Sequence, residues 1–411
     1  MQAPLQANEH SRQVLDYIRA HEAPLLQFAR DLVATPSPTP PGDERAVAAR
    51  IVGELEKLGL GSPEVIAGKP ERPNLLLRLG SGRPGRSLIL NGHIDTKPAG
   101  EVAQWRTPPF DPVIKDGFLY GLGSTDMKGA VAAMVYATAA LAKVRPALAG
   151  ELQLLLTADE EGGSGWGAKY LAEHGHLKAD AALIGEPSGI RRELEYVDLD
   201  SRGILCVRFR VHGDQMHSSL SDEFKAVNAS VKAAELLLDF RSFFQRPGMT
   251  VNAGVTLQGG VYFGVVPGTA EFGCDVRVPV GTCETTMRTE VEEWLQTRQR
   301  QDPDLRVQSV WETPPSTWIP PVHFPADHPL AVSLIEASRC ILPDLPAVGC
   351  FPGATDAPWF VAAGVPTIPS FGPGLLPLAH SPNECVRVSS ILDCARIYAL
   401  CALGYLAAKL P

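Results

Sequence analysis

Four apolar runs, each followed by a short polar cluster, constrain the fold of this chain more than any other feature. The runs have the length and composition of buried strands and cover residues 87–91, 152–157, 181–184 and 365–371. The polar residues that follow them are, in turn, His93 with Asp95, Glu160 with Glu161, Glu186 and, after a longer interval, His380. In an open α/β sheet, residues just beyond the carboxyl ends of the strands meet in space although they are distant in sequence. The pattern therefore predicts one site where histidines and carboxylates converge, as in a metal centre.

The chain of 411 residues is longer than one hydrophobic core usually serves, so we expect two domains. The first part alternates helix-like and strand-like segments, which predicts an α/β domain with a mostly parallel sheet and helices on both faces. Residues 45–58 repeat apolar side chains with a helical period, and residues 74–79 have the pattern of a further strand. Asp126, a fifth candidate for the site, lies directly before an apolar helical stretch at 127–142.

The pattern changes after residue 195. Strand-like segments at 204–211 and 270–280 flank a helix-like segment at 226–240, and another follows at 284–298, which predicts a small α+β domain. Residues 306–325 are rich in Pro and Trp and suit a linker that returns the chain to the first domain. We therefore expect one domain made of residues 1–200 and 315–411, into which a smaller domain of residues 201–314 is inserted.

Composition excludes some classes of partner. A formal net charge of -9 argues against nucleic acid or an anionic membrane surface as the main partner. The longest apolar stretch, residues 130–142, is too short to span a bilayer and no secretory signal is visible, so we expect a soluble cytoplasmic protein. The 8 cysteines contain no Cys-x-x-Cys pair, which argues against a thiolate zinc site or a disulfide framework.

The spacing of His93 and Asp95 suits a metal ligand and its support. Two residues apart in an extended segment, both side chains point to the same side, and an Asp there can accept the second ring N–H of a metal-bound His. A solvent-facing loop is the alternative interpretation. Asp126 alone is weaker evidence, because Asp before a helix is most often a cap.

Paired acids such as Glu160 and Glu161 repel each other unless a cation or a proton offsets their charge. Adjacent residues in an extended chain face opposite ways, so one can ligate metal while the other holds a water; a solvated strand end is the alternative. The glycines that follow do not form a phosphate loop, and Ser164 is not in a nucleophile elbow because Trp166 stands where Gly is required.

The inventory is two histidines and three carboxylates for metal, with one acid left over as a base. Nitrogen and oxygen ligands without sulfur suit zinc, although cobalt or manganese would also fit. Two divalent ions bridged by a carboxylate can share a water, lower its pKa and stabilise an oxyanion, so we expect two ions.

The order of these motifs resembles the dinuclear zinc deacylase and exopeptidase family, which includes acetylornithine deacetylase, succinyl-diaminopimelate desuccinylase, aminoacylase and the bacterial glutamate carboxypeptidase. The motifs run over nearly the whole chain and comprise residues 36–44, His93-x-Asp95, Asp126-Met127-Lys128-Gly129, Glu160-Glu161, Glu186-Pro187, residues 371–374 and residues 380–384. The resemblance implies a catalytic domain and an inserted lid domain that also carries the contact of a homodimer.

Carried over residue by residue, the resemblance implies a role for each member of the site. One ion is held by His93 and Glu186, the other by Glu161 and His380, and Asp126 bridges them. Glu160 is implied as the general base that takes a proton from the water and delivers it to the leaving amine. Asp95 is implied to orient His93, and the Asp126–Met127 peptide to be cis.

In the smaller domain, the resemblance implies that His217 reaches a neighbouring active site and donates to the developing oxyanion; an ordinary surface histidine is the alternative. Arg277 matches an arginine that clamps a substrate carboxylate, a task that suits its planar fork of donors. Further candidate substrate-binding residues are Gly353, Thr355 and Asp356. The chain departs from the family at two positions, with Gly264 where relatives commonly carry Asn and Leu122 where Arg is frequent. Both changes concern the substrate more than the reaction.

We therefore predict a metal-dependent hydrolase that cleaves the amide bond of an N-acyl amino acid or related small metabolite bearing a carboxylate. The Gly-Glu-Pro and Phe-Gly-Pro-Gly stretches favour an enzyme similar to acetylornithine deacetylase over the peptidase branch. A dipeptidase or carboxypeptidase of the same family is one alternative. The alternative from another class is a catalytically silent, metal-free binding protein on the same fold, against which the complete set of ligands argues.

Overall fold

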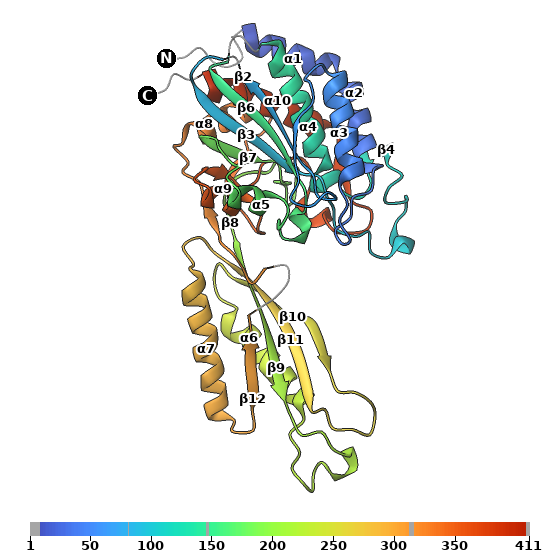
Figure 1. The fold of residues 1–411 in the computed structure, drawn as a ribbon, viewed down its shortest axis with the longest axis vertical. Helices are drawn as coiled ribbons and strands as arrows, with labels where there is room; N and C mark the ends of the chain where they lie inside the picture. The colour runs from blue at the N-terminus through green and yellow to red at the C-terminus, as the bar shows by residue number, and fades with distance from the viewer. Residues whose placement is uncertain (1–8, 81, 145–147, 312–315, 408–411) are drawn as a thin grey trace. The chain divides into compact units, whose positions relative to one another are not determined.

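The computed structural model describes residues 9–80, 82–144, 148–311 and 316–407. The chain divides into two compact units (Figure 1). The first comprises the chain up to Asp200, His323–Phe351 and the chain from Thr355 onwards, and the second comprises Ser201–Val322 and Pro352–Ala354. The boundary expected between residues 314 and 315 lies outside the described residues.

The first unit is built on a six-stranded sheet of order β1-β2-β6-β3-β7-β16. Its strands are β1 (Glu64–Ile66), β2 (Asn74–Gly80), β3 (Arg86–His93), β6 (Gly150–Thr157), β7 (Ala181–Ile184) and β16 (Thr367–Ile368). The β6, β3, β7 and β16 strands run parallel, whereas β1 and β2 are joined antiparallel at one edge. Helices flank this sheet on both sides, which confirms the predicted α/β class (Figure 1).

The parallel strands are apolar because they are covered on both faces. Leu88, Ile89 and Leu90 in β3 have no exposed surface, and β7 is buried over its full length. Such continuous apolar runs are typical of parallel strands under helices. Because β3, β6 and β7 are parallel, their carboxyl ends lie side by side at the same end of the sheet. The polar clusters follow directly after these strand ends.

Two long apolar helices pack against this sheet and against each other: α4 (Gly129–Lys143) and α10 (Val388–Ala407). Both are buried nearly all round, the pattern of a helix inside a core rather than on a surface. By length and composition α10 is apolar enough to cross a membrane, but its burial in the first unit accounts for that composition.

The other helices of the first unit are α1 (Glu9–Ala20), α2 (Glu22–Val33), α3 (Arg45–Lys57), α5 (Ala168–Glu173), α8 (Pro329–Ile341) and α9 (Ala357–Ala362). Two small sheets have the orders β17-β5-β4 and β14-β8-β15. Their strands are β4 (Val113–Lys115), β5 (Phe118–Tyr120), β17 (Cys385–Arg387), β8 (Tyr196–Ser201), β14 (Val322–His323) and β15 (Ala347–Phe351). The helix predicted at 45–58 is confirmed as α3, whereas α1 and α2 were not predicted.

The second unit is an antiparallel sheet of order β10-β11-β9-β12, with β13 also paired to β9 and two helices alongside. Its elements are β9 (Gly203–His212), α6 (Ala229–Phe244), β10 (Thr250–Gly259), β11 (Thr269–Val278), α7 (Glu284–Gln301), β12 (Arg306–Val310) and β13 (Trp318–Ile319). Aromatic side chains from strands and helices fill its core, among them Phe209, Phe240, Phe272 and Trp294.

One prediction for the second unit was wrong in part, and one of its strands was not predicted. The segment 306–325 is not only a linker, because β12 and β13 within it pair with β9. The β10 strand was missed because it forms the edge of its sheet and most of its side chains are exposed, so no alternation of apolar residues marks it. All eight cysteines lie within the described residues, and none of them forms a disulfide.

Candidate metal centre

His93 is the last residue of β3, and its imidazole is almost fully buried. Its Nδ1 lies 3.1 Å from the backbone carbonyl oxygen of Asp95 and 3.5 Å from the Asp95 carboxylate, so the carbonyl is the closer partner of the ring. A hydrogen bond from Nδ1–H to this oxygen leaves the other ring nitrogen, Nε2, available to a metal ion. Asp95 was predicted to orient His93. It sets the tautomer of His93 mainly through its backbone carbonyl and less through its carboxylate.

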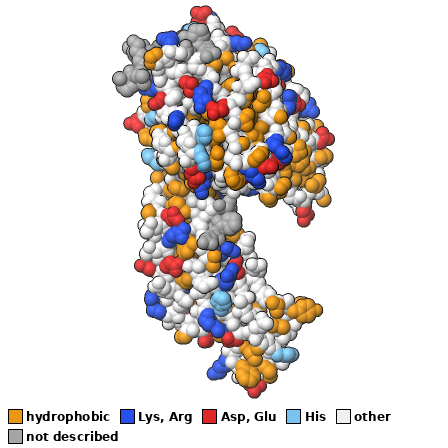
Figure 2. Space-filling view, viewed as in Figure 1, with side chains coloured by type: hydrophobic (Ala, Val, Ile, Leu, Met, Phe, Trp, Pro, Cys, Tyr) orange, Lys and Arg blue, Asp and Glu red, His pale blue; other side chains and the backbone are white. Residues whose placement is uncertain are grey.

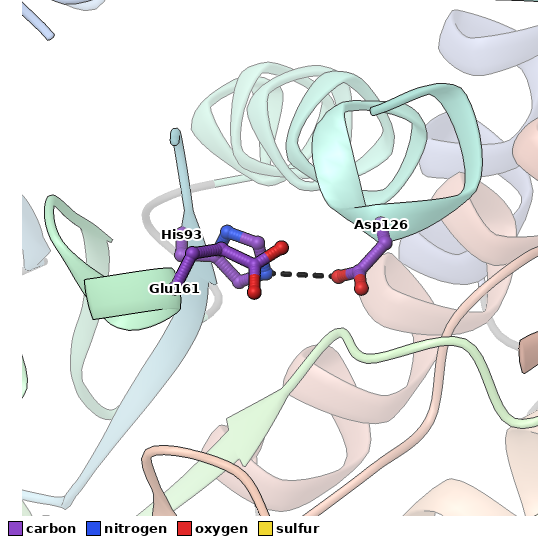
Figure 3. Close-up of side chains that lie close together, drawn as sticks. All are labelled: His93, Asp126 and Glu161. Carbon is purple, nitrogen blue, oxygen red and sulfur yellow. Dashed lines mark hydrogen bonds and ion pairs between the residues drawn. The ribbon is translucent and has the colours of Figure 1, made fainter. Parts of the chain in front are cut away.

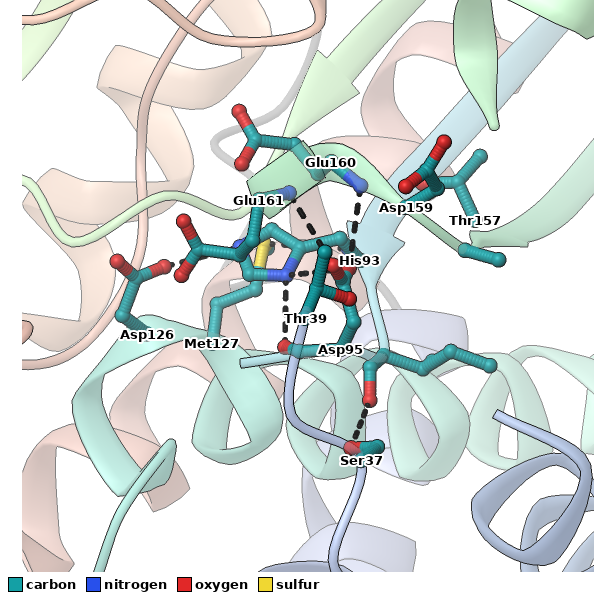
Figure 4. Close-up of polar contacts among 12 residues, drawn as sticks. Ser37, Thr39, His93, Asp95, Asp126, Met127, Thr157, Asp159, Glu160 and Glu161 are labelled. Atoms are coloured by element: carbon teal, nitrogen blue, oxygen red, sulfur yellow. Dashed lines mark hydrogen bonds and ion pairs between the residues drawn. The ribbon is translucent and has the colours of Figure 1, made fainter. Parts of the chain in front are cut away.

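The carboxylate of Asp95 makes its own contacts, which the sequence did not indicate (Figure 4). Its Oδ1 accepts the backbone N–H of Glu160 at 3.1 Å, and its Oδ2 accepts that of Glu161 at 3.2 Å. The sequence suggested that the two glutamates lie in extended chain. They lie instead in a short helical turn that follows β6. Asp95 thus links the end of β3 to the turn that carries both acids.

Asp126 faces His93 (Figure 3) and also contacts the second histidine of the site, His380. Its Oδ1 is 2.9 Å from Nε2 of His93, and its Oδ2 is 3.1 Å from Nε2 of His380. The residue is buried in the loop before α4, and the Asp126–Met127 peptide is cis, as the resemblance implied. One carboxylate therefore offers one oxygen to each histidine, the arrangement that a bridging ligand requires.

The remaining carboxylates complete the cluster. Oε1 of Glu161 is 2.9 Å from Nε2 of His380, and Oε1 of Glu186 is 3.7 Å from Nε2 of His93. The ligand atoms of His93, Asp126 and Glu161 lie within 4.8 Å of one another, and so do those of His93, Glu160 and Glu186. Convergent imidazole nitrogens and carboxylate oxygens of this kind fit a divalent transition metal.

The electrostatics of the cluster also favour a cation. Burial, followed by the neighbouring carboxylates, holds the pKa of both Glu160 and Glu186 well above its ordinary value, although His93 opposes this effect. Burial alone would lower the pKa of His380, but its bonds to Asp126 and Glu161 raise this pKa to about 11. Acids that resist ionisation and an imidazole that holds a proton indicate an anionic cluster that positive charge stabilises.

The sequence interpretation missed Lys97, which lies beside these carboxylates. Its Nζ is 2.9 Å from Oε2 of Glu161 and donates to the backbone carbonyl of the same residue at 2.5 Å. Burial lowers the pKa of this lysine, but the negative charge of Glu161 raises it. The net effect is a pKa above the ordinary value. Lys97 is two residues beyond Asp95, and residues with this spacing in an extended segment point to the same side. This spacing could have indicated that Lys97 belongs to the site.

The other predicted residues are distributed over both units. His217 and Arg277 belong to the second unit, and Gly353 lies in the Pro352–Ala354 segment that groups with it. The ring of His217 is exposed and its Nδ1 accepts the backbone N–H of Ser219, while Arg277 donates to the Asp275 carboxylate at 3.3 Å. His217 and Arg277 therefore each have a local partner.

Thr355 and Asp356 are buried in the first unit. The hydroxyl of Thr355 accepts the backbone N–H of Ala357 at the start of α9. The Asp356 carboxylate accepts hydrogen bonds from Ser164 and from Thr157 at the end of β6. These contacts hold the first turn of α9 against the strand end, and a direct role in substrate binding stays a prediction.

Comparison with known proteins adds to this geometry. Residues 89–403 match Peptidase family M20/M25/M40. The chain is 30% identical over 387 residues to succinyl-diaminopimelate desuccinylase from Methylobacillus flagellatus, which covers 91% of this chain and 97% of the relative. The Nitrosomonas eutropha enzyme of the same name is also 30% identical, over 91% of this chain and 96% of the relative.

Solved structures share the fold at low identity. An M20 family metallo-carboxypeptidase from Sulfolobus solfataricus superposes with a TM-score of 0.73 at 17% identity, over 93% of this chain and 99% of the other. A dinuclear metal-binding peptidase from Bacillus subtilis gives 0.68 at 16% identity, over 94% of this chain and 99% of the other.

Proposed function

Because the chain belongs to Peptidase family M20/M25/M40 and is a metal-dependent hydrolase of amide bonds, we propose that it deacylates an N-acyl amino acid or a related small metabolite. The observation that carries this proposal is the position of Asp126, whose two carboxylate oxygens face two histidines from distant parts of the chain. That arrangement supports a centre for two ions, which the hydrolysis of an unactivated amide can use.

The proposed ligands divide into two sets around this shared carboxylate. His93 and Glu186 hold one ion, Glu161 and His380 hold the other, and Asp126 contributes to both. Zinc suits these nitrogen and oxygen donors, and cobalt or manganese would also fit. When bound, two such ions lower the pKa of a shared water and stabilise the oxyanion that forms at the amide carbonyl.

Glu160 is the proposed general base. It is less buried than the four proposed ligands other than His380. Its backbone N–H is bonded to Asp95, which fixes the position of its side chain beside His93 and Glu186. From there it takes a proton from the attacking water and later delivers it to the leaving amine, which needs a carboxylate within reach of both. Asp95 acts as a positioning residue for this turn and for His93.

Residues of the second unit are proposed to bind the substrate. His217 is exposed and its Nδ1 is hydrogen-bonded, which orients the ring to donate to a developing oxyanion. Arg277 offers a planar fork of donors for a substrate carboxylate, and Asp275 holds one of its nitrogens. Gly353, Thr355 and Asp356 are the remaining candidates for contacts near the substrate.

We also propose that the enzyme is a homodimer in which the second unit carries the contact. The β10 strand is the open edge of its sheet and exposes Val255 and Leu257, and Leu238 on α6 is 61% exposed. Figure 2 shows apolar side chains gathered on the surface of this unit. An apolar strand edge is a template for pairing with another chain. Light scattering should show a dimer that L257K weakens, whereas V348K, a change at an exposed valine of the first unit, should leave it intact.

The test of the reaction compares N-acetyl and N-succinyl amino acids with dipeptides as substrates of the purified, metal-loaded protein. Release of the free amino acid from the acylated compounds is expected. Turnover of dipeptides alone would instead establish the second candidate, a dipeptidase or carboxypeptidase, which the peptidases among the structural neighbours favour.

A matched variant tests the mechanism separately from the substrate. E160Q should lower kcat about 10²- to 10⁴-fold, the usual contribution of a general base, while metal content stays near the wild-type value. E173Q, a change at an exposed glutamate of α5, is the control and should retain full activity. A wild-type protein that retains less than one divalent ion per chain would favour the silent binding protein. We also propose a cytoplasmic location, which the lack of disulfides among the eight described cysteines supports.

A further inference from the structure

Asp126 lies in a short, distorted helical turn, Ser124–Lys128, whose backbone is not helical at Asp126 and Met127. One side chain accepts three backbone N–H groups in and directly before this turn. Oε2 of Glu384 accepts the N–H of Gly123 at 3.0 Å, and Oε1 accepts those of Thr125 at 2.8 Å and Asp126 at 3.1 Å. Glu384 is 1% exposed. Buried N–H groups need an acceptor, and the non-helical backbone at Asp126 does not supply one.

The segment that contains Glu384, residues 380–387, also bonds to this loop through its main chain. The carbonyl of Glu384 accepts the N–H of Gly121 at 3.0 Å, and the carbonyl of Cys385 accepts the hydroxyl of Thr125 at 2.8 Å. Cys385 then starts β17, which pairs with β5 directly before the loop. This segment therefore contributes several of the hydrogen bonds that hold the loop in its shape.

The same segment carries His380, a proposed ligand of the second ion. His380 contacts both Asp126 and Glu161 through Nε2, and only Ser381, Pro382 and Asn383 separate it from Glu384. One short stretch thus supplies one histidine of the centre and the anchor for the bridging aspartate, which comes from a part of the chain more than 250 residues earlier.

We propose that Glu384 is a positioning residue that couples the bridging aspartate to the histidine near the C-terminus and so sets the metal affinity of the centre. This inference rests on the proposed function, because it presupposes that the cluster binds two ions. A carboxylate is required since only two oxygens without hydrogens can accept three N–H groups. An amide of the same shape would keep Thr125 and Asp126 bonded but would direct its own N–H at the N–H of Gly123.

The test is the E384Q variant, which is nearly isosteric, measured against E195Q. Oε2 of Glu195 also accepts three backbone N–H groups, from Ile190, Arg191 and Arg192, but it serves a surface turn. Apoproteins would be titrated with Zn²⁺ and Co²⁺ against a chelator, and kcat and KM would be measured at saturating metal. The visible spectrum of the Co²⁺ form reports coordination geometry independently of turnover.

We expect E384Q to raise the dissociation constant of the ions about tenfold or more, to alter the Co²⁺ spectrum, and to lower kcat about tenfold with KM within twofold. E195Q should match the wild type in all three. If E384Q does not fold, E384D keeps the charge on a shorter arm and should show an intermediate loss of affinity.

Two failures can be told apart. A wild type that binds no divalent ion would remove the proposed function and this inference together. A wild type that binds two ions, with E384Q or E384D binding them equally well and giving the same spectrum, would remove this inference alone, since Glu384 would then only stabilise the fold.

Discussion

Replacement of Asp95 by Asn should weaken one of the two proposed ions more than the other. The carboxylate accepts one N–H group on each oxygen, from Glu160 and from Glu161, and its Oδ1 is also the oxygen that lies 3.5 Å from Nδ1 of His93. The amide oxygen of an asparagine will therefore stay beside His93 and Glu160, because an amide nitrogen there would meet two N–H groups. Its NH₂ group must then face the N–H of Glu161.

The magnitude follows from that single lost bond. A hydrogen bond to a charged acceptor contributes about 1.5 to 3 kcal/mol, and each 1.4 kcal/mol is a factor of about ten in an equilibrium constant. If most of this loss appears when Glu161 must take its position as a ligand, D95N should bind the ion at Glu161 and His380 about 10- to 100-fold more weakly. The ion at His93 and Glu186 should be affected less, since the bond to the carbonyl of residue 95 remains.

The assay is metal stoichiometry as a function of free Zn²⁺, buffered by a chelator, with urea unfolding of the metal-free protein as a second measurement. D95N should hold one ion at concentrations where the wild type holds two. The control is D180N, because Asp180 accepts the N–H and the hydroxyl of Ser87 near the opposite end of β3. Equal weakening of both ions, or a loss of stability without any change in stoichiometry, would refute the assignment of Asp95 to the turn.

Three further predictions concern charge and metal. K97M should bind the ion at Glu161 up to about fivefold more tightly, because Glu161 no longer has to give up an ion pair with Lys97. A partly exposed ion pair of this kind is worth at most about 1 kcal/mol. Unchanged or weaker binding in the same titration would mean that Lys97 orients Glu161 instead. Burial raises the pKa of Asp198 from its ordinary value near 4 to about 7. The protonated carboxyl therefore contributes its full stability below about pH 4, and this contribution is lost as the pH rises through 7. D198N should therefore gain on the wild type by about 2 to 4 kcal/mol in the free energy of urea unfolding between pH 5 and 9, and a difference that is constant with pH would contradict this. Chelation should lower the melting temperature by several degrees, because ions at 100 times their Kd add about 2.7 kcal/mol each, and restored Zn²⁺ should reverse the change; a melting temperature indifferent to metal would count against the centre.

Local patterns were sufficient for much of the fold and for the identity of the cluster. The strands β3, β6 and β7 were visible as apolar runs because parallel strands are buried on both faces, and the polar residues beyond their ends were visible because a buried strand cannot carry them. His93, Glu161 and Glu186 could therefore be found from the sequence. The β10 strand could not, since an exposed edge has no apolar period to detect.

Which atoms meet was a matter of long-range contacts. Asp95 bonds to residues 65 and 66 positions later in the chain, Lys97 reaches Glu161, and Glu384 holds a loop that precedes it by more than 250 residues. No property of a sequence window records such a pairing, because the buried N–H groups of a loop must find an acceptor wherever the fold brings one. The sequence therefore indicated which residues belong to the site, through their chemistry and the periodicity of the strands before them. The hydrogen bonds that position these residues depend on how the whole chain packs.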